Sequence, residues 1–311
     1  MKTIGLLFGM EQTFPPALVA RINSLEVEGV SAEFIKTGGV TLEDLLKYDV
    51  ILDRISQDIP FYRAMLKFAA LQGVRVVNNP FWWSADDKFF NCAIAEKVGV
   101  PVPKTVLLPT KNHPPSTTSE SMRNMIYPLN WEELFNYVGF PAYLKPHDGG
   151  GWKHVYKCDN PKEFFDAYDQ TGDITMILQE GIEFDEYYRC YAIGKKYIKI
   201  MPYEPRNPHH LRYVASFTPS KERLEQLEDY CIRLVTALDY DFDTLEFAVR
   251  DGIPYAIDFL NPAPDAERTS VQEENFEWVL DTAAQYLVEL ALEGRKTPNG
   301  YAWSSFINSG K

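Results

Sequence analysis

Cysteine is scarce in this chain, and no two cysteines lie close together in the sequence. The four that occur, Cys92, Cys158, Cys190 and Cys231, are spread over 311 residues, and there is no C-x-x-C. A disulfide framework is typical of short secreted chains, whereas a chain of this length buries a core without one. We therefore expect reduced, mostly buried thiols in a cytoplasmic protein. A catalytic cysteine is the alternative, and no local pattern favours it.

Long apolar runs and an excess of positive charge are lacking as well. No stretch approaches the roughly 18 apolar residues that cross a bilayer. The opening "MKTIGLLFGMEQTF" has neither the basic start nor the cleavage site of a signal peptide. With 31 Lys and Arg against 44 Asp and Glu, the net charge is −13. We therefore expect neither a membrane nor a nucleic-acid partner, because broad binding to nucleic-acid phosphates needs a positive surface.

The two common glycine-rich nucleotide motifs are absent too. The segment "KPHDGGGWKHVYK", Lys145 to Lys157, contains Gly149, Gly150 and Gly151 but matches neither G-x-x-x-x-G-K-[ST] nor G-x-G-x-x-G before a helix. Both flanks have the alternation of strands, which predicts a hairpin with a glycine tip. Glycine has no Cβ, so the backbone N–H groups of such a tip can approach an anion. A flexible turn without a ligand is the alternative.

What the sequence does contain is a regular alternation of strand and helix patterns up to about residue 80. This alternation favours an α/β unit with a parallel sheet. In this part we expect strands over 2–9, 31–37, 49–55 and 75–79, and helices over 14–30, 41–48 and 59–74. Further on we expect helices over 84–99, 131–139, 160–172, 220–238 and 275–292, strands over 140–146, 152–158, 174–180, 187–194 and 196–204, and a hairpin over 243–262. Residues 109–130, rich in Pro, Ser, Thr and Asn, predict a long surface loop.

Two lysines stand at unusual positions. Lys88 lies in the first turn of the helix that Ser84 is expected to cap, where a cation opposes the helix dipole unless an anion is bound. The neighbouring acids Asp86 and Asp87 are an alternative explanation. Lys145 lies in the apolar strand "PAYLKP" and must either meet an anion or reach water at a sheet edge.

The late hairpin carries two acids whose relation depends on its turn, Asp251-Gly252. A two-residue turn pairs Glu246 with Ile257 and puts Glu246 and Asp258 on opposite faces. A three-residue loop puts both acids on one face, within about 5–8 Å. With the side-chain oxygen of Asn261 they then form a site for a hard cation. Two solvated acids on an exposed face are the alternative.

The order of these features resembles that of the ATP-grasp superfamily. A helix-start lysine, a strand lysine, a glycine hairpin, an apolar strand ending in Gln179-Glu180, and then acid, acid and amide follow one another over nearly the whole chain. The stretch "DKFFNCAIAEKVGVPVPKT" is similar to the glutathione synthetase and ribosomal-protein glutamate ligase (RimK-like) branch. The resemblance implies an α/β (α+β) ATP-grasp fold with three domains. They are a pre-ATP-grasp domain over 1–100, a small lid subdomain over 101–180, and a C-terminal metal-binding subdomain over 181–311.

The same resemblance implies roles for the residues. The glycine hairpin would be a lid over the phosphates of ATP, Lys88 and Lys145 would bind phosphate oxygens and frame the adenine, and two Mg²⁺ ions would be held by acids. The implied nucleotide residues are Lys88, Lys145, Gly149, Gly150 and Gly151, with Gln179 and Glu180 at the adenine hinge and Glu183 or Glu186 on the ribose. The implied metal ligands are Glu246, Asp258 and Asn261. The family motif is Glu-x-Asn, whereas Asp258-Phe259-Leu260-Asn261 has a shorter acid and one extra residue, which a bulge at Phe259 would absorb.

The reaction that the resemblance implies is an ATP-dependent ligation of a small carboxylate to an amine through an acylphosphate. Arginines are natural clamps for carboxylates. Arg54 follows a strand, at the end where α/β sheets bind ligands, and is the expected substrate residue. Arg189 and Arg212 are the expected catalytic residues, and surface ion pairs are the alternative for all three. A kinase or phosphotransferase, a non-catalytic nucleotide-binding regulator and an unrelated binding protein stay open as functions, and a homodimer stays open as the assembly.

Overall fold

The computed structural model describes residues 1–82, 87–213 and 217–296. Packing groups them into two compact units. Unit 1 is formed by the described parts of Met1–Ala85, Glu186–Phe247 and Asp258–Lys311, and unit 2 by those of Asp86–Asp185 and Ala248–Ile257. The division into three domains stays a prediction.

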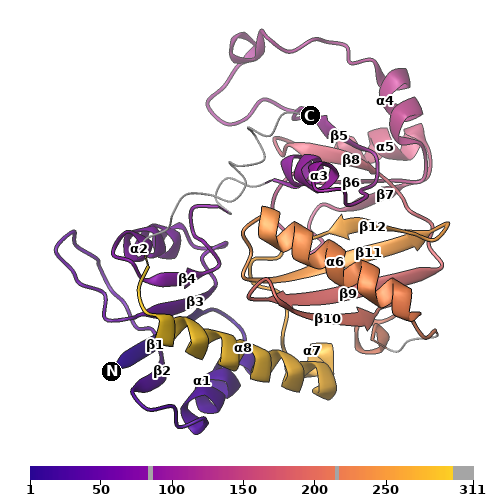
Figure 1. Cartoon of the computed structure of the whole chain (residues 1–311). Helices are drawn as coiled ribbons and strands as arrows, with labels where there is room; N and C mark the ends of the chain where they lie inside the picture. The colour runs from indigo at the N-terminus through magenta and orange to yellow at the C-terminus, as the bar shows by residue number, and fades with distance from the viewer. Residues whose placement is uncertain (83–86, 214–216, 297–311) are drawn as a thin grey trace. The chain divides into compact units, whose positions relative to one another are not determined.

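The N-terminal part of unit 1 is the expected parallel sheet. Its strands are β1 (Lys2–Phe8), β2 (Val30–Phe34), β3 (Val50–Arg54) and β4 (Arg75–Val77), in the order β2-β1-β3-β4 (Figure 1). Helices α1 (Phe14–Ser24) and α2 (Pro60–Leu71) connect strands of this sheet. The helix expected over 41–48 is wrong, because these residues form a turn and irregular chain. Leu42 and Leu45 are 91% and 88% exposed, whereas Leu46 and Tyr48 pack on the core, which is little apolar contact to stabilise so short a helix.

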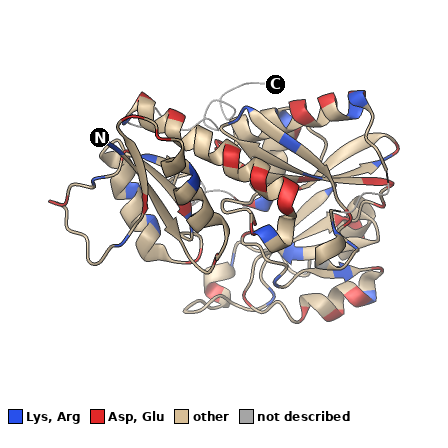
Figure 2. Cartoon of the chain, turned by 90° about the horizontal axis from the view of Figure 1, so that it is seen from below, with Lys and Arg blue, Asp and Glu red and all other residues tan. Residues whose placement is uncertain are grey.

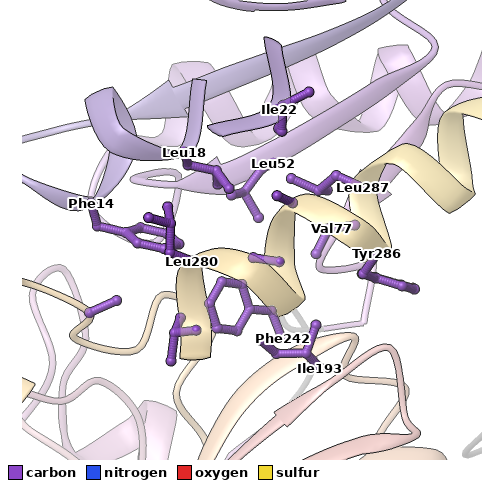
Figure 3. Packing of buried hydrophobic residues seen from close by; sticks show 14 of the residues in the cluster. Phe14, Leu18, Ile22, Leu52, Val77, Ile193, Phe242, Leu280, Tyr286 and Leu287 are labelled. Carbon is purple, nitrogen blue, oxygen red and sulfur yellow. The ribbon is translucent and has the colours of Figure 1, made fainter. Parts of the chain in front are cut away.

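The two faces of this sheet are covered by different helices. Helix α1 and the long C-terminal helix α8 (Glu273–Glu293) pack on one face, and α2 packs on the other. Figure 3 shows Phe14 and Leu18 of α1 beside Leu280 and Leu287 of α8. The first and last described elements of the chain therefore share one apolar core.

The second sheet is antiparallel between β9 and β10 and has the order β10-β9-β11-β12. Its strands are β9 (Glu186–Ile193), β10 (Tyr197–Pro202), β11 (Phe242–Arg250) and β12 (Ile253–Asp258). Helix α6 (Lys221–Ala237) packs on β9 and β10. Leu227, Cys231, Leu234 and Val235 of α6 and Leu238 directly after it are buried, whereas Leu224 is 37% exposed. Short turns of helix, η2 (His209–Leu211) and α7 (Arg268–Val271), complete this part.

The turn between β11 and β12 has two residues. Asp251 and Gly252 have φ of +53° and +77°, and a two-residue turn with both central residues at positive φ is of type I′. The three-residue loop on which the predicted metal site depended is therefore wrong.

Unit 2 contains a four-stranded antiparallel sheet of order β5-β8-β6-β7. Its strands are β5 (Thr105–Leu108), β6 (Ala142–Pro146), β7 (Tyr156–Cys158) and β8 (Met176–Glu180). Its helices are α3 (Lys88–Lys97), η1 (Ser119–Met122), α4 (Trp131–Val138) and α5 (Pro161–Tyr168). Residues of α4 and α5 form the core of one face of this sheet.

Helix starts in unit 2 follow from their caps. The side chain of Asn160 accepts a hydrogen bond from the backbone N–H of Glu163 at 3.0 Å, with Pro161 at the first helical position, which confirms the predicted start of α5. Helix α3 begins at Lys88, and its cap is Asp87, which accepts from the N–H of Phe90 at 2.8 Å. The predicted cap, Ser84, lies outside the described residues.

Composition and structure agree on two general points. All four cysteines are buried and none forms a disulfide in the described chain, which confirms the prediction of buried thiols. Acidic and basic residues occur together on helices, strands and loops (Figure 2). A search of the described helices finds none with both the length and the apolar character that a bilayer crossing requires.

Candidate active site

The two predicted nucleotide residues of the unit 2 sheet share one face. Lys145 of β6 lies opposite Ile177 of β8, and Gln179 of β8 lies opposite Tyr143. Side chains alternate along a strand, and Ala142 and Leu144 point to the core formed with α4 and α5. Lys145 and Gln179 therefore lie on the other face, as diagonal neighbours.

Lys145 is a buried cation. The residue is 8% exposed, and its ammonium donates to the backbone carbonyl of Ile257 at 3.3 Å. A lysine in such a place costs free energy unless its charge is answered by partners. Lys145 is therefore a buried cation on this face of the sheet, with the carbonyl of Ile257 among its partners.

Lys88 is held by the glycine loop. Its ammonium donates to the carbonyl of Gly149 at 2.6 Å, and its backbone N–H donates to the carbonyl of His147 at 2.7 Å. Among the described residues no carboxylate lies within ion-pair distance of Lys88. The start of α3 and the start of the glycine loop are thus joined by two hydrogen bonds to backbone carbonyls.

The glycine loop is longer than the sequence predicts. Strand β7 begins at Tyr156, so residues 152–155 belong to the loop and the strand expected from residue 152 is too long. Gly149 and Gly151 have φ of +74° and +73°, which L-residues with a side chain rarely adopt. A Cβ on any of the three glycines, Gly150 included, would meet no described atom within 4 Å. Backbone conformation rather than packing therefore requires glycine at two of the three positions.

The side chains of the predicted adenine hinge already have protein partners. Gln179 donates to the hydroxyl of Thr105 at 3.0 Å. Glu180 accepts from Arg250 at 2.8 Å and from the N–H of Lys104 at 3.3 Å. In the next residue, Gly181, the N–H donates to Pro141 at 2.8 Å, and a Cβ would lie only 2.7 Å from that carbonyl oxygen. The hinge is therefore a tightly packed backbone rather than a set of open side chains.

The two candidates for the ribose differ. Glu183 is exposed in unit 2. Glu186 belongs to unit 1 and accepts from the hydroxyl of Tyr188 at 2.6 Å and from Nε of Arg223, on α6, at 3.3 Å. Glu186 is therefore engaged on the face of β9 that α6 covers.

Two of the predicted metal ligands, both in unit 1, act on one tyrosine. The hydroxyl of Tyr187 donates to Glu246 at 2.6 Å, and Nε of Arg189 lies 3.9 Å from the other oxygen of the same carboxylate. Burial raises the pKa of Tyr187 well above its ordinary value, and the charges of Glu246 and then Asp258 raise it further. Both acids therefore act on one buried hydroxyl. We call the three predicted metal ligands, the acids Glu246 and Asp258 and the amide Asn261, the carboxylate cluster.

The charge of Asp258 acts on Tyr187 together with that of Glu246, although the turn has two residues. Asp258 is the last residue of β12, so the alternation of the ladder no longer fixes the direction of its side chain. Asn261 returns to β11 through hydrogen bonds. Its N–H donates to the carboxylate of Asp243 and its Nδ2 to the carbonyl of Thr244, both at 3.0 Å. Side-chain bonding thus absorbs the extra residue of the Asp-x-x-Asn motif.

The two predicted catalytic arginines meet at Tyr203. The guanidinium of Arg189 lies 5.7 Å from the ring centroid of Tyr203, and Nη2 of Arg189 donates to the hydroxyl of Thr244 at 3.4 Å. Nη1 of Arg212 lies 3.4 Å from the hydroxyl of Tyr203, and its Nε donates to the carbonyl of Asn207 at 3.2 Å. The structure therefore joins both arginines to the carboxylate cluster through aromatic side chains.

Arg54 has an internal carboxylate partner. Its Nε and Nη2 bind both oxygens of Glu11 at 2.6–2.9 Å, and its side chain is 2% exposed. Arg54, which is predicted to bind a substrate carboxylate, therefore already binds a carboxylate of the chain itself.

Comparison with known proteins tests the fold. No family model matches the chain, and no curated protein sequence matches it. Solved structures do. A D-alanine–D-alanine ligase from Bacillus anthracis complexed with ATP matches over 100% of both chains at TM-score 0.62 and 16% identity. The VanG D-Ala:D-Ser ligase from Enterococcus faecalis (15% identity) and a RimK domain ATP-grasp protein from Sphaerobacter thermophilus (13%) each match 93% of this chain and 99% of their own at TM-score 0.65. The chain has the ATP-grasp fold.

The ATP-grasp fold expected from the sequence is confirmed, and this fold implies a bound metal. Within the described residues no group of three or more His, Cys, Asp or Glu side chains is arranged to hold a metal. Mg²⁺ is commonly bound by one or two carboxylates together with substrate phosphates and water. Glu246 and Asp258 supply two carboxylates whose charges both act on Tyr187, and Asn261 supplies an amide oxygen. The donor set therefore fits Mg²⁺.

Several residues of this ATP-grasp chain were missed by sequence reasoning. The predicted site residues are contacted by Tyr187, Tyr203 and Thr244, and Arg54 forms an ion pair with Glu11. The signal for Tyr187 was present, because it stands two residues before Arg189 and so shares its face of the strand. Nothing in the sequence pattern distinguishes Glu11 from other loop acids.

Proposed function

We propose that the protein is an ATP-dependent ligase that joins a small carboxylate to an amine through an acylphosphate. The observation that carries the proposal is the hydrogen bond from Tyr187 to Glu246, with the charge of Asp258 acting on the same hydroxyl, in an ATP-grasp fold whose other unit has two lysines that each donate to a backbone carbonyl. Support also comes from the solved structures of similar fold, whose names describe ligases and, in one case, bound ATP.

In this proposal unit 2 binds the nucleotide. Lys145 and Lys88 exchange the carbonyls of Ile257 and Gly149 for phosphate oxygens, which bind an ammonium more strongly because they are charged. The backbone of the glycine loop, Gly149 to Gly151, covers the phosphates, and the backbone around Gly181 receives the adenine edge. Glu183 is the better placed of the two ribose candidates, because Glu186 is bound to Arg223.

Unit 1 supplies the metal ligands and the positive charge for the reacting groups. Glu246, Asp258 and Asn261 would hold Mg²⁺, two ions in the arrangement that the resemblance implies, and Mg²⁺ neutralises the charge that develops on the transferred phosphoryl group. Tyr187 and Arg189 fix the carboxylate of Glu246 before any ligand binds. Arg212 and Arg189 bring guanidinium groups to the same cluster.

The reaction then needs little covalent help from the protein. A carboxylate oxygen of the first substrate attacks the γ-phosphorus, the bond to the β-phosphate oxygen breaks, and ADP leaves. The uncharged amine of the second substrate attacks the acyl carbon, the C–O bond to phosphate breaks, and the nitrogen loses a proton to water. Arg189 and Arg212 stabilise the acylphosphate oxygens, and the other groups act by position and charge.

Release of ADP and phosphate, measured over pairs of small carboxylates and amines, tests the proposal. We expect release that depends on both partners, with a product whose mass is the sum of the two minus water. A rise of the thermal midpoint with Mg·ATP reports nucleotide binding separately. The variant Glu246→Gln controls for contaminating ATPases.

Other outcomes point elsewhere. ADP formation that needs one acceptor and transfers phosphate to it would favour a kinase or phosphotransferase. A midpoint shift without turnover would favour a nucleotide-binding regulator, and the absence of a shift would end the nucleotide proposal. We further propose small molecules as the only substrates and the cytoplasm as the site of action, with a homodimer as one assembly to test by light scattering.

A further inference from the structure

The carboxyl ends of the strands in the parallel sheet carry buried polar side chains. Arg54 is the last residue of β3, Asn78 directly follows β4, and Glu11 comes shortly after β1. This edge of an α/β sheet is where ligands usually bind. In this chain the edge binds another part of unit 1 instead.

Asn78 uses its whole side-chain amide. Its Nδ2 donates to the carbonyls of Phe242 at 2.8 Å and Pro262 at 3.0 Å, and its Oδ1 accepts from the N–H groups of Asp241 at 2.7 Å and Phe242 at 2.8 Å. The residue is 2% exposed. It therefore ties the start of β11 to the segment that follows Asn261.

Arg54 holds the same segment from the neighbouring strand. Besides Glu11, its Nη2 donates to the carbonyl of Pro264. Its guanidinium lies 4.9 Å from the ring centroid of Phe14 and 5.3 Å from that of Phe242. The ion pair with Glu11 keeps this buried charge compensated, so the guanidinium is a fixed donor.

The segment over 262–265 is thus bound through several of its carbonyls. Asn78 binds Pro262, Arg54 binds Pro264, and the hydroxyl of Tyr191 binds the carbonyl of Asp265. Asn261 is bound to β11 through its own N–H and Nδ2. The candidate metal ligand with the unusual spacing is therefore held both by its own hydrogen bonds and by those of the segment that follows it.

We propose that Arg54 and Asn78 are positioning residues that hold the 262–265 segment and thereby the metal-binding geometry of Asn261. This inference rests on the proposed function and gives Arg54 a different role from the substrate clamp that the sequence predicts. One nitrogen of Arg54, Nη1, is buried without a hydrogen-bond partner among the described residues. A substrate carboxylate at Nη1 is the competing role, and the two roles predict different measurements.

The variant Arg54→Lys keeps the charge and loses the fork that reaches both Glu11 and Pro264. Binding of Mn²⁺ in the presence of a non-hydrolysable ATP analogue, followed by electron paramagnetic resonance, reports the metal site without turnover. We expect Mn²⁺ to bind about 10–100-fold more weakly, as for other residues that orient metal ligands. The matched control is Arg75→Lys at the opposite end of the same sheet, where Arg75 pairs with the exposed Glu293 at 3.2 Å, and it should bind Mn²⁺ like the wild type.

A double-mutant cycle separates positioning from a general structural effect. If Arg54 acts through Asn261, Arg54→Lys adds little further loss of Mn²⁺ binding in an Asn261→Ala background, because the ligand that it orients is gone. Additive losses would overturn the proposal. So would unchanged Mn²⁺ binding in Arg54→Lys, and with a raised KM for the carboxylate that result would establish the substrate clamp.

A second variant and a separate outcome for the proposed function complete the test. If Arg54→Lys does not fold by circular dichroism, Tyr191→Phe removes only the hydroxyl that binds Asp265 and is judged by the same outcomes. If the wild type binds Mn²⁺ and nucleotide but ligates no substrate pair, the proposed function fails while the Mn²⁺ measurements still decide the positioning role.

Discussion

The carboxylate cluster of unit 1 and the two lysines of unit 2 are held by different kinds of partner. Glu246 is bound by the side chains of Tyr187 and Arg189, which come from β9. Lys88 and Lys145 donate to backbone carbonyls. A side-chain donor fixes a carboxylate in place, whereas a neutral carbonyl is readily replaced by a charged phosphate oxygen. In the proposed function the acids of unit 1 have side-chain partners before binding and are called the prepared side, whereas the lysines of unit 2 would exchange these carbonyls for phosphate oxygens and are called the exchangeable side.

The largest expected effect comes from removing a charge of the prepared side. Glu246→Gln should lower kcat about 10³-fold, because metal-bound charge stabilisation is worth several kcal/mol and each ~1.4 kcal/mol is tenfold in rate. Steady-state kinetics at saturating Mg·ATP measures it. The control is Glu274→Gln, whose side chain is 90% exposed in an ion pair with Lys199. Full activity of Glu246→Gln would remove the metal assignment.

The exchangeable side should show its effect in nucleotide binding. Lys145→Met should raise the KM for ATP about 10–100-fold, since hydrogen bonds to charged groups contribute about 1.5–3 kcal/mol. Lys88→Met should raise it less, because Lys88 is only partly buried and water screens its charge. Lys162→Met, at a side chain that is 84% exposed, is the control. A larger effect at Lys88 than at Lys145 would reverse the assignment of the main phosphate ligand.

A smaller effect should follow from loosening the prepared side without removing a charge. Tyr187→Phe deletes the hydroxyl that binds Glu246, and the Mg²⁺ concentration for half-maximal rate should rise about tenfold. Arg189 still contacts the carboxylate, so kcat at saturating Mg²⁺ should stay close to that of the wild type. An unchanged Mg²⁺ dependence would show that the acids need no fixed partner, and the contrast between the two sides would then fail.

The smallest expected effect concerns stability within unit 2. Gly181→Ala places a Cβ 2.7 Å from the carbonyl of Pro141 and should lower the free energy of unfolding by about 1–3 kcal/mol, as overpacking does. Gly150→Ala, where a Cβ meets no described atom within 4 Å, should change it by less than about 0.5 kcal/mol. Urea unfolding compares the two. Equal losses would mean that the hinge is no more tightly constrained than the glycine loop.

The parts of the fold that the sequence predicts well are those fixed by local chemistry. The alternation of strands and helices up to residue 80 identifies the parallel sheet, and Asn160-Pro161 locates the start of α5. The helix expected over 41–48 fails because Leu42 and Leu45 remain exposed in the folded chain, which is a tertiary effect. The turn at Asp251-Gly252 is a different case, since Asp-Gly is a strong signal for a two-residue turn, whereas the predicted metal site requires the longer loop.

The sequence predicts the residue types of the candidate site better than it predicts their hydrogen-bond and ion-pair partners. The apolar strand pattern singles out Lys145, and the resemblance groups the acids with Asn261. The partners come from elements distant in sequence. Glu11 lies 43 residues before Arg54, and Tyr187 lies 59 residues before Glu246. Many other acids and tyrosines of the sequence could supply such partners equally well, so only the folded chain identifies the residues that meet.

The shared core of α1 and α8 has a consequence for the order in which the chain matures on the ribosome. When the first 85 residues have emerged, one apolar face of the parallel sheet still lacks α8, which is made nearly 200 residues later. Unit 2 is almost continuous, and only the ten-residue stretch of the late hairpin must be added to it. We therefore expect the inserted unit to condense first during synthesis, while the earliest segment waits for its covering helix, because distant contacts form slowly.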